Sequence, residues 1–312
     1  METPVTARLL RFYILMIVAF MLAWPTAWAN PKIKVVTTIF PLYDFARQVG
    51  GDKVDVSMLL PPGVEVHSFE PRPGDIVALS KADIFIYTGS AMEPWAEDIL
   101  KGVSPHHVLA VDTSRGIDLM DAADHAAEPE DLHRHGGKDP HIWLDPVLAQ
   151  TMIDTIARAF VSRDPLNEGL YLSNAQSYKN KLKDLHQHIE IALASCEIRT
   201  IIYGGHFAFG YFARRYGLTQ VSPYNGFSPD TEPSPQRIRA IIDTIRRLDS
   251  RVIYYEEMID PRVARVIALE TGAHLEMLSG AHNVPKNALS TTTYLEIMEA
   301  NVLKLKAGLR CP

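Results

Sequence analysis

Histidines and carboxylates are concentrated in a short stretch in the middle of the chain. The histidines of residues 124–141 are His125, His133, His135 and His141. The last of them stands in "GGKDPHIWLDP" (136–146), between two Asp-Pro steps that restrict the backbone. Neutral imidazole is the commonest zinc ligand in proteins, and carboxylates also bind metal cations. The pattern indicates metal chemistry, with His141 held in a fixed turn beside a ligand-rich segment.

Two more histidines stand where strands are expected to end. His67 follows an apolar run in "PPGVEVHSFEP" (61–71), and His206 follows "RTIIYGG" (199–205). Ligands of open α/β sheets bind beyond the carboxyl ends of the strands. A single loop histidine is more often a surface or hydrogen-bonding residue, but a cleft between the two halves of the chain would bring His67, His141 and His206 together. Three imidazoles and one further group complete a tetrahedral zinc shell.

Strands and helices alternate in the first half of the chain. β-branched runs bounded by Pro and Gly predict strands, and stretches with 3.6-residue periodicity predict helices between them. The expected order is a strand and helix in 32–51, a strand in 53–63, a helix in 71–82, and strands in 83–90 and 106–114. Short links between alternating elements are typical of a parallel sheet with helices on its faces.

Two long helical patterns follow, and then the alternation resumes. Residues 147–164 form the first pattern, and residues 167–195 form a second that is long enough to bridge two bodies. Strand and helix patterns then alternate from 199 to a last helix in 291–309. We therefore predict an α/β protein of two lobes, each a mostly parallel sheet flanked by helices, joined by a long rigid connecting helix. The predicted parts are a signal peptide (1–29), an N-terminal lobe (30–145), a helical connector (146–195) and a C-terminal lobe (196–312).

The first 29 residues are typical of an export signal. Arg8 and Arg11 precede an apolar run at 12–24, and Ala27-Trp28-Ala29 supplies the small-x-small pattern of a cleavage site. We expect cleavage near Asn30 and, in a Gram-negative source, a location in the periplasm; an uncleaved membrane anchor is the alternative. The net charge of −6 without a basic block gives no reason to expect nucleic-acid binding.

The chain contains two cysteines, Cys196 and Cys311. In an oxidising compartment an isolated pair is expected to form a disulfide, which would tie the C-terminus to the second half. Two free buried thiols are the alternative. Neither cysteine has the neighbours of a metal or redox motif.

Several motifs follow one another in order along nearly the whole mature chain. They are "VVTTIFPLYDFARQVGGD" (35–52), the stretch 61–95, "DPHIWLDP" (139–146), "HFAFGYFARRYGL" (206–218), "EPSPQRI" (232–238), "ETGA" (270–273) and "TYLEIMEANVLKLKAGL" (293–309). In these motifs the sequence resembles the metal-binding solute-binding proteins that serve ABC importers of zinc and manganese. The resemblance implies that His67, His141 and His206 are metal ligands. It also implies that residues 124–138 are a mobile metal-collecting loop, with a merely solvated polar loop as the alternative.

Two positions depart from the pattern of that family. Phe207 stands directly after the third ligand, where the family commonly has Asp, and Ser279 stands where the family commonly supplies a carboxylate as the fourth ligand. Ser is a poor zinc ligand. His282 in the same loop is the candidate replacement. Glu65, Glu257 and a water molecule are the competitors.

The expected function is that of a periplasmic receptor without catalytic activity. It would bind Zn²⁺ as the transported ligand and, as a monomer, deliver it to an ABC transporter membrane permease. A manganese or iron receptor of the same family is one alternative, and a metal-stabilised structural or adhesive protein is another. A secreted zinc hydrolase also uses three histidines, but the chain has no H-E-x-x-H motif.

Overall fold

The computed structural model describes residues 31–64, 66–67, 69–103, 107–121, 137–224, 232–257 and 260–312. The described residues from Ile33 to Pro312 belong to one compact unit. The predicted signal peptide lies outside the described residues. In the part of the chain that is described, no helix is both long enough and apolar enough to cross a membrane.

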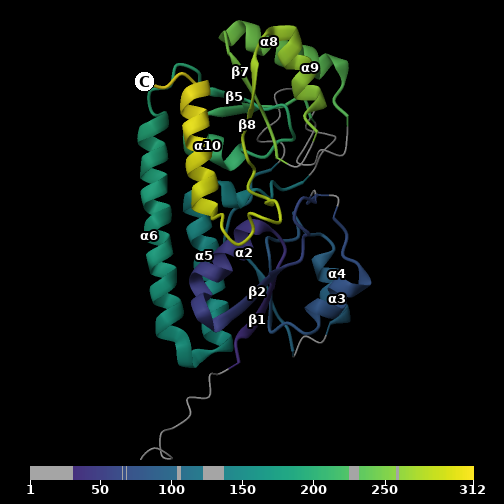
Figure 1. The fold of residues 1–312 in the computed structure, drawn as a ribbon, viewed down its shortest axis with the longest axis vertical. Helices are drawn as coiled ribbons and strands as arrows, with labels where there is room; N and C mark the ends of the chain where they lie inside the picture. The colour runs from purple at the N-terminus through teal and green to yellow at the C-terminus, as the bar shows by residue number, and fades with distance from the viewer. Residues whose placement is uncertain are drawn as a thin grey trace, which may run out of the picture. The chain divides into compact units, whose positions relative to one another are not determined.

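A four-stranded parallel sheet forms the core of the first half (Figure 1). Its strands, in the order β2-β1-β3-β4, are β2 (Val54–Met58), β1 (Ile33–Thr37), β3 (Ile84–Tyr87) and β4 (Leu109–Asp112). The helices of this half are α2 (Phe40–Gly50), α3 (Pro73–Leu79) and α4 (Ala96–Gly102). Side chains alternate across a strand, so one face of the sheet packs with α2 and the other face packs with α3 and α4.

The two long helical patterns form α5 (Pro146–Arg163) and α6 (Glu168–Leu193). Asp145 caps α5 by accepting a hydrogen bond from the Val147 N–H at 2.8 Å, and Pro146 occupies the first helical position. α6 buries one stripe at helical spacing, from Tyr171 to Leu193. It packs against α2 and α5 of the first half and α10 of the second, as Figure 1 shows. The long connecting helix is therefore confirmed.

The second half contains two pairs of short parallel strands instead of one continuous sheet. β5 (Thr200–Ile202) pairs with β6 (Thr219–Val221), and β7 (Val252–Tyr255) pairs with β8 (His274–Met277). A parallel bridge between Tyr203 and Tyr254 joins the pairs. The helices are α7 (Gly210–Arg215), α8 (Pro235–Leu248), α9 (Arg262–Thr271) and α10 (Tyr294–Gly308). The predicted α/β architecture with parallel sheets is confirmed, whereas the boundaries of the predicted parts stay a prediction.

Cys196 and Cys311 form a disulfide. Backbone hydrogen bonds from Ile198 N–H to Leu309 O (3.1 Å) and from Glu197 N–H to Arg310 O (3.4 Å) accompany it. The end of the chain is thereby fastened to the segment that follows α6. The alternative of two free thiols is wrong.

Asp44 of α2 joins three helices in the interior. Its Oδ2 accepts hydrogen bonds from the Tyr178 hydroxyl of α6 and from the Tyr294 N–H at the start of α10, both at 3.0 Å. Its side chain is buried, and a carboxylate at a helix N-terminus is favoured by the helix dipole. Asp44 therefore joins α2 of the first half to the connecting helix α6 and to α10 of the second half.

We expect Asp44→Ala to lower the free energy of unfolding by about 3 kcal/mol, because two buried donors lose their acceptor and each costs about 1–3 kcal/mol. Urea denaturation of the metal-free protein measures the change. Asp184→Ala, at an exposed position of the same connecting helix α6, is the control and should change little. An unchanged midpoint and slope for Asp44→Ala would show that this carboxylate does not join the helices.

Candidate metal centre

Four histidines meet between the two halves of the described chain: His67, His141, His206 and His282. Each offers one ring nitrogen, and these nitrogens all lie within 4.8 Å of one another. The Nε2 of His206 lies 3.2 Å from the Nε2 of His67 and 3.2 Å from the Nε2 of His141. Zinc–nitrogen bonds of about 2.0–2.1 Å in a tetrahedron place the nitrogens about 3.4 Å apart. The two spacings at His206 Nε2 are therefore close to those of a tetrahedral zinc shell.

The four imidazoles come from four separate loops. His67, His206 and His282 each follow a parallel strand, namely β2, β5 and β8. His141 directly precedes the short 3-10 helix η4 (Ile142–Leu144), which leads into α5. His67 is half-buried, whereas the other three side chains are buried. The fold thus brings together the three histidines expected at the site and the candidate fourth.

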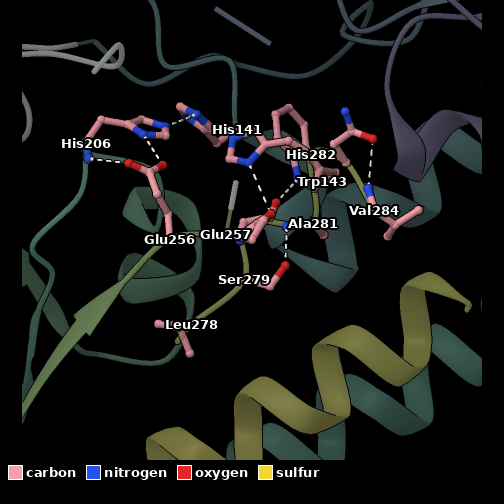
Figure 2. Close-up of polar contacts among 12 residues, drawn as sticks. His141, Trp143, His206, Glu256, Glu257, Leu278, Ser279, Ala281, His282 and Val284 are labelled. Atoms are coloured by element: carbon pink, nitrogen blue, oxygen red, sulfur yellow. Dashed lines mark hydrogen bonds and ion pairs between the residues drawn. The ribbon is translucent and has the colours of Figure 1, made fainter. Parts of the chain in front are cut away.

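Carboxylates contact three of these imidazoles at Nδ1, the ring nitrogen opposite the meeting point. Asp139 Oδ1 lies 2.8 Å from His141 Nδ1, and Glu256 Oε2 lies 2.6 Å from His206 Nδ1. Glu257 Oε1 lies 3.6 Å from His282 Nδ1. Figure 2 shows Glu256 beside His206 and Glu257 beside His282. An imidazole whose Nδ1–H donates to a carboxylate presents its Nε2 lone pair to a metal.

Two glycines allow these close approaches. A Cβ on Gly205 would lie 2.6 Å from Glu256 Oε1, and a Cβ on Gly280 would lie 2.2 Å from the His282 ring. The next residue, Ala281, has a positive φ of 57°, which is uncommon for a residue with a side chain. The Trp143 indole N–H donates to Gly280 O at 2.8 Å and fixes this turn. The local sequence "SGAHN" (279–283) therefore bends tightly enough to place His282.

Asn283 fastens the loop of His282 to the loop of His67. Its side-chain amide donates to Pro61 O at 2.8 Å and to Val64 O at 3.0 Å. The Phe40 N–H at the start of α2 donates to His282 O at 3.0 Å. These bonds connect ligand loops that are more than 200 residues apart in the sequence.

Burial and neighbouring groups shift the pKa values at the site. Burial lowers the pKa of His67 well below its usual range, and the charges of His206 and His282 lower it further. Burial raises the pKa of Asp139 well above its usual range, against the hydrogen bond from the His141 N–H. Burial acts in the same direction on Glu257, but the hydrogen bond and charge of His282 outweigh it and leave the pKa of Glu257 below its usual value. A lowered histidine pKa favours neutral imidazole, which is the form that binds metal, and a bound dication favours ionised carboxylates.

The competitors for the fourth position are placed differently. Glu257 is not one of the four residues whose ligand atoms meet, and it contacts the far side of the His282 ring. Glu65 lies outside the described residues. The Ser279 hydroxyl accepts a hydrogen bond from the Ala281 N–H at 3.1 Å. Of the predicted collecting loop, residues 124–136 also lie outside the described residues.

The carboxylates that contact the imidazoles were not assigned that role from the sequence. Asp139 stands two residues before His141, so its place in "DPHIWLDP" was the available signal. Glu256 and His206 are 50 residues apart, and no local pattern connects them. The sequence alone offers Glu257 only as a candidate ligand.

Known proteins are similar to this chain along most of its length. The sequence profile described as the periplasmic zinc-uptake complex component A, ZnuA, matches residues 35–308. The chain is 38% identical over 282 residues to the high-affinity zinc uptake system protein ZnuA of Bacillus subtilis, which covers 89% of this chain and 88% of that protein. It is 33% identical over 292 residues to the zinc-binding protein AdcA of Streptococcus pyogenes, covering 89% of this chain and 56% of that longer protein.

A solved structure agrees with the fold. The Zn(II)-bound ZnuA-like domain of AdcA from Streptococcus pneumoniae superimposes with a TM-score of 0.74 at 28% identity, covering 89% of this chain and 99% of that one. The fold, the converging imidazoles and the family profile lead to one conclusion. The chain belongs to the ZnuA family of periplasmic zinc-uptake components.

Proposed function

We propose that this chain is a high-affinity zinc receptor, which binds one Zn²⁺ through His67, His141, His206 and His282 and delivers it to an ABC-type permease. The observation that carries the proposal is the convergence of four imidazole nitrogens within 4.8 Å of one another. Four nitrogen ligands suit tetrahedral zinc. The ion is the cargo, so the site has to hold it tightly and later release it.

The placement of the ligands supports capture between the two halves. Three rings are buried and held by their neighbours, whereas His67 is half-buried. We propose that zinc enters on the side of His67 and that the other three imidazoles form a preformed base. The connecting helix α6, which packs with both halves, restricts closure to a small movement.

A hydrolase is a weaker proposal than a receptor. Catalytic zinc sites commonly have three protein ligands and leave the fourth position to water. Here a fourth imidazole, that of His282, lies with the other three, which supports a donor set of four histidines. We therefore propose a receptor without catalytic activity, acting as a monomer in the periplasm after removal of residues 1–29.

Metal analysis of residues 30–312 after chelation and reloading tests the proposal. We expect one tightly bound zinc per chain and a rise in melting temperature on reloading, because a ligand that binds only the folded state stabilises it. The same zinc-loaded sample should not turn over ester or peptide substrates. Failure to retain zinc would refute the receptor, and turnover that depends on zinc would favour the hydrolase.

The predicted collecting loop is tested separately by deletion. Removing residues 124–138 should leave the single tight zinc site intact and abolish only weaker additional binding, because a flexible segment loses conformational entropy when it holds a metal. Isothermal titration with zinc measures both classes of site. Loss of the tight site on deletion would show that the loop contributes to the tight zinc site itself.

A further inference from the structure

Each of three buried carboxylates faces the ring of a histidine of the metal centre and accepts a hydrogen bond from a backbone N–H of the loop that carries that histidine. Asp139 Oδ1 accepts from the His141 backbone N–H at 2.9 Å and lies 2.8 Å from the Nδ1 of the same residue. Glu256 accepts from the His206 backbone N–H at 3.4 Å through Oε1, and its Oε2 lies 2.6 Å from the His206 ring.

Glu257 repeats the pattern on the loop of the fourth histidine. Its Oε2 accepts from the Gly280 N–H at 2.8 Å, and its Oε1 faces His282 Nδ1 at 3.6 Å. The side chains of Asp139, Glu256 and Glu257 are all at most 8% exposed. Asp139 and Glu256 therefore lie within hydrogen-bonding distance of both a ring and its backbone N–H, whereas Glu257 hydrogen-bonds to the backbone of the His282 loop and faces the ring from farther away.

We propose that Asp139, Glu256 and Glu257 are positioning residues that fix the tautomer of His141, His206 and His282 and so prepare the centre before metal arrives. The proposal rests on the proposed function, since it assigns these residues to the same zinc site. A carboxylate oxygen that accepts a hydrogen bond from the ring requires the proton to lie on the facing Nδ1. The Nε2 of each ring then presents a lone pair to the ion.

The geometry at Nε2 explains why such control is needed. His206 Nε2 lies 3.2 Å from the Nε2 of both His67 and His141, which is within hydrogen-bonding distance. In the other tautomer, His206 Nε2–H would donate to one of these rings and occupy the lone pairs that zinc requires. A carboxylate at His206 Nδ1 disfavours that competing state. The three carboxylates also place negative charge behind neutral ligands, where it favours a dication.

The test measures histidine tautomers and zinc affinity in the same proteins. Long-range ¹⁵N NMR of the metal-free wild type at neutral pH should show the Nδ1–H tautomer for His141, His206 and His282. In Glu256→Gln the side-chain amide can turn and donate to Nδ1, so His206 should gain the Nε2–H tautomer. Loss of a group that orients a ligand typically costs roughly tenfold to a hundredfold in metal affinity, and we expect that loss for zinc.

A matched control stands elsewhere on the protein. Glu299 Oε2 lies 2.9 Å from His188 Nδ1, in an exposed pair between α10 and α6. Glu299→Gln removes the same kind of contact and should leave zinc affinity unchanged. Asp139→Asn provides a second variant at the centre should Glu256→Gln fail to fold.

The outcomes separate this proposal from the proposed function. An Nε2–H tautomer for His206 in the metal-free wild type would overturn the positioning role, as would wild-type zinc affinity in both Glu256→Gln and Asp139→Asn. A wild type that shows the expected tautomers but retains no zinc would leave the positioning of the rings standing and refute the receptor. The tautomer measurement needs no metal, so it reports even when zinc binding fails.

Discussion

Replacing His67, His141 or His206 by alanine is expected to weaken zinc binding by roughly a hundredfold or more in each case. In the proposed centre, each change removes one of four nitrogen donors and leaves three. Titration against a chromophoric zinc chelator measures the affinity. Melting curves with and without zinc should show a smaller metal-induced rise for each variant.

The metal-free variants should differ from one another in stability. His141 and His206 are buried, so their removal leaves cavities beside Asp139 and Glu256, whereas His67 is half-buried and its removal admits water. We therefore expect His67→Ala to keep the wild-type melting temperature most closely. His274→Ala, at an exposed position of β8, is the control for zinc affinity. Wild-type affinity in any one of the three variants would remove that histidine from the site.

Equimolar zinc is expected to displace manganese almost completely near neutral pH. Imidazole nitrogens suit zinc, whereas manganese favours carboxylate and water oxygens and a higher coordination number. The four groups whose ligand atoms meet are all imidazoles. The Irving–Williams order favours zinc over manganese as well, and it implies that copper or nickel can also bind in vitro.

Competition is followed by metal analysis after equilibrium dialysis against both ions. Comparable occupancy by the two metals would refute the zinc assignment and leave the receptor assignment standing. Zinc affinity should also fall below about pH 6, because protons then compete for imidazole. Burial lowers the pKa of His67, so this ring stays neutral, and able to bind metal, to a lower pH than a free imidazole.

Much of the fold follows from local patterns. Alternating β-branched runs and Pro-bounded helices predicted the parallel sheet around β1 and the helices α5 and α6, because these elements bury a regular stripe of apolar side chains. The short strand pairs of the second half were not predicted. Whether these strands form one sheet or two pairs depends on contacts between residues far apart in the sequence. Local sequence patterns do not reveal such contacts.

The metal centre was predictable to different degrees. Expected strand ends pointed to His67 and His206, because ligands of α/β sheets bind beyond the carboxyl ends of the strands, and the turn between two Asp-Pro steps pointed to His141. His282 became a candidate only through the resemblance to metal receptors. The contact between Glu256 and His206 could not be foreseen, since two residues 50 positions apart meet only through the bridge that joins β5 to β7.

X-ray absorption at the zinc edge, on protein loaded with one zinc per chain, tests the central claim most directly. We predict four nitrogen neighbours at about 2.0–2.1 Å with the scattering pattern of imidazole rings. In His282→Ala one nitrogen should be replaced by an oxygen, whereas His274→Ala should reproduce the wild-type spectrum. A wild-type shell that contains carboxylate oxygens, or that has five or six neighbours, would contradict a centre built from four histidines.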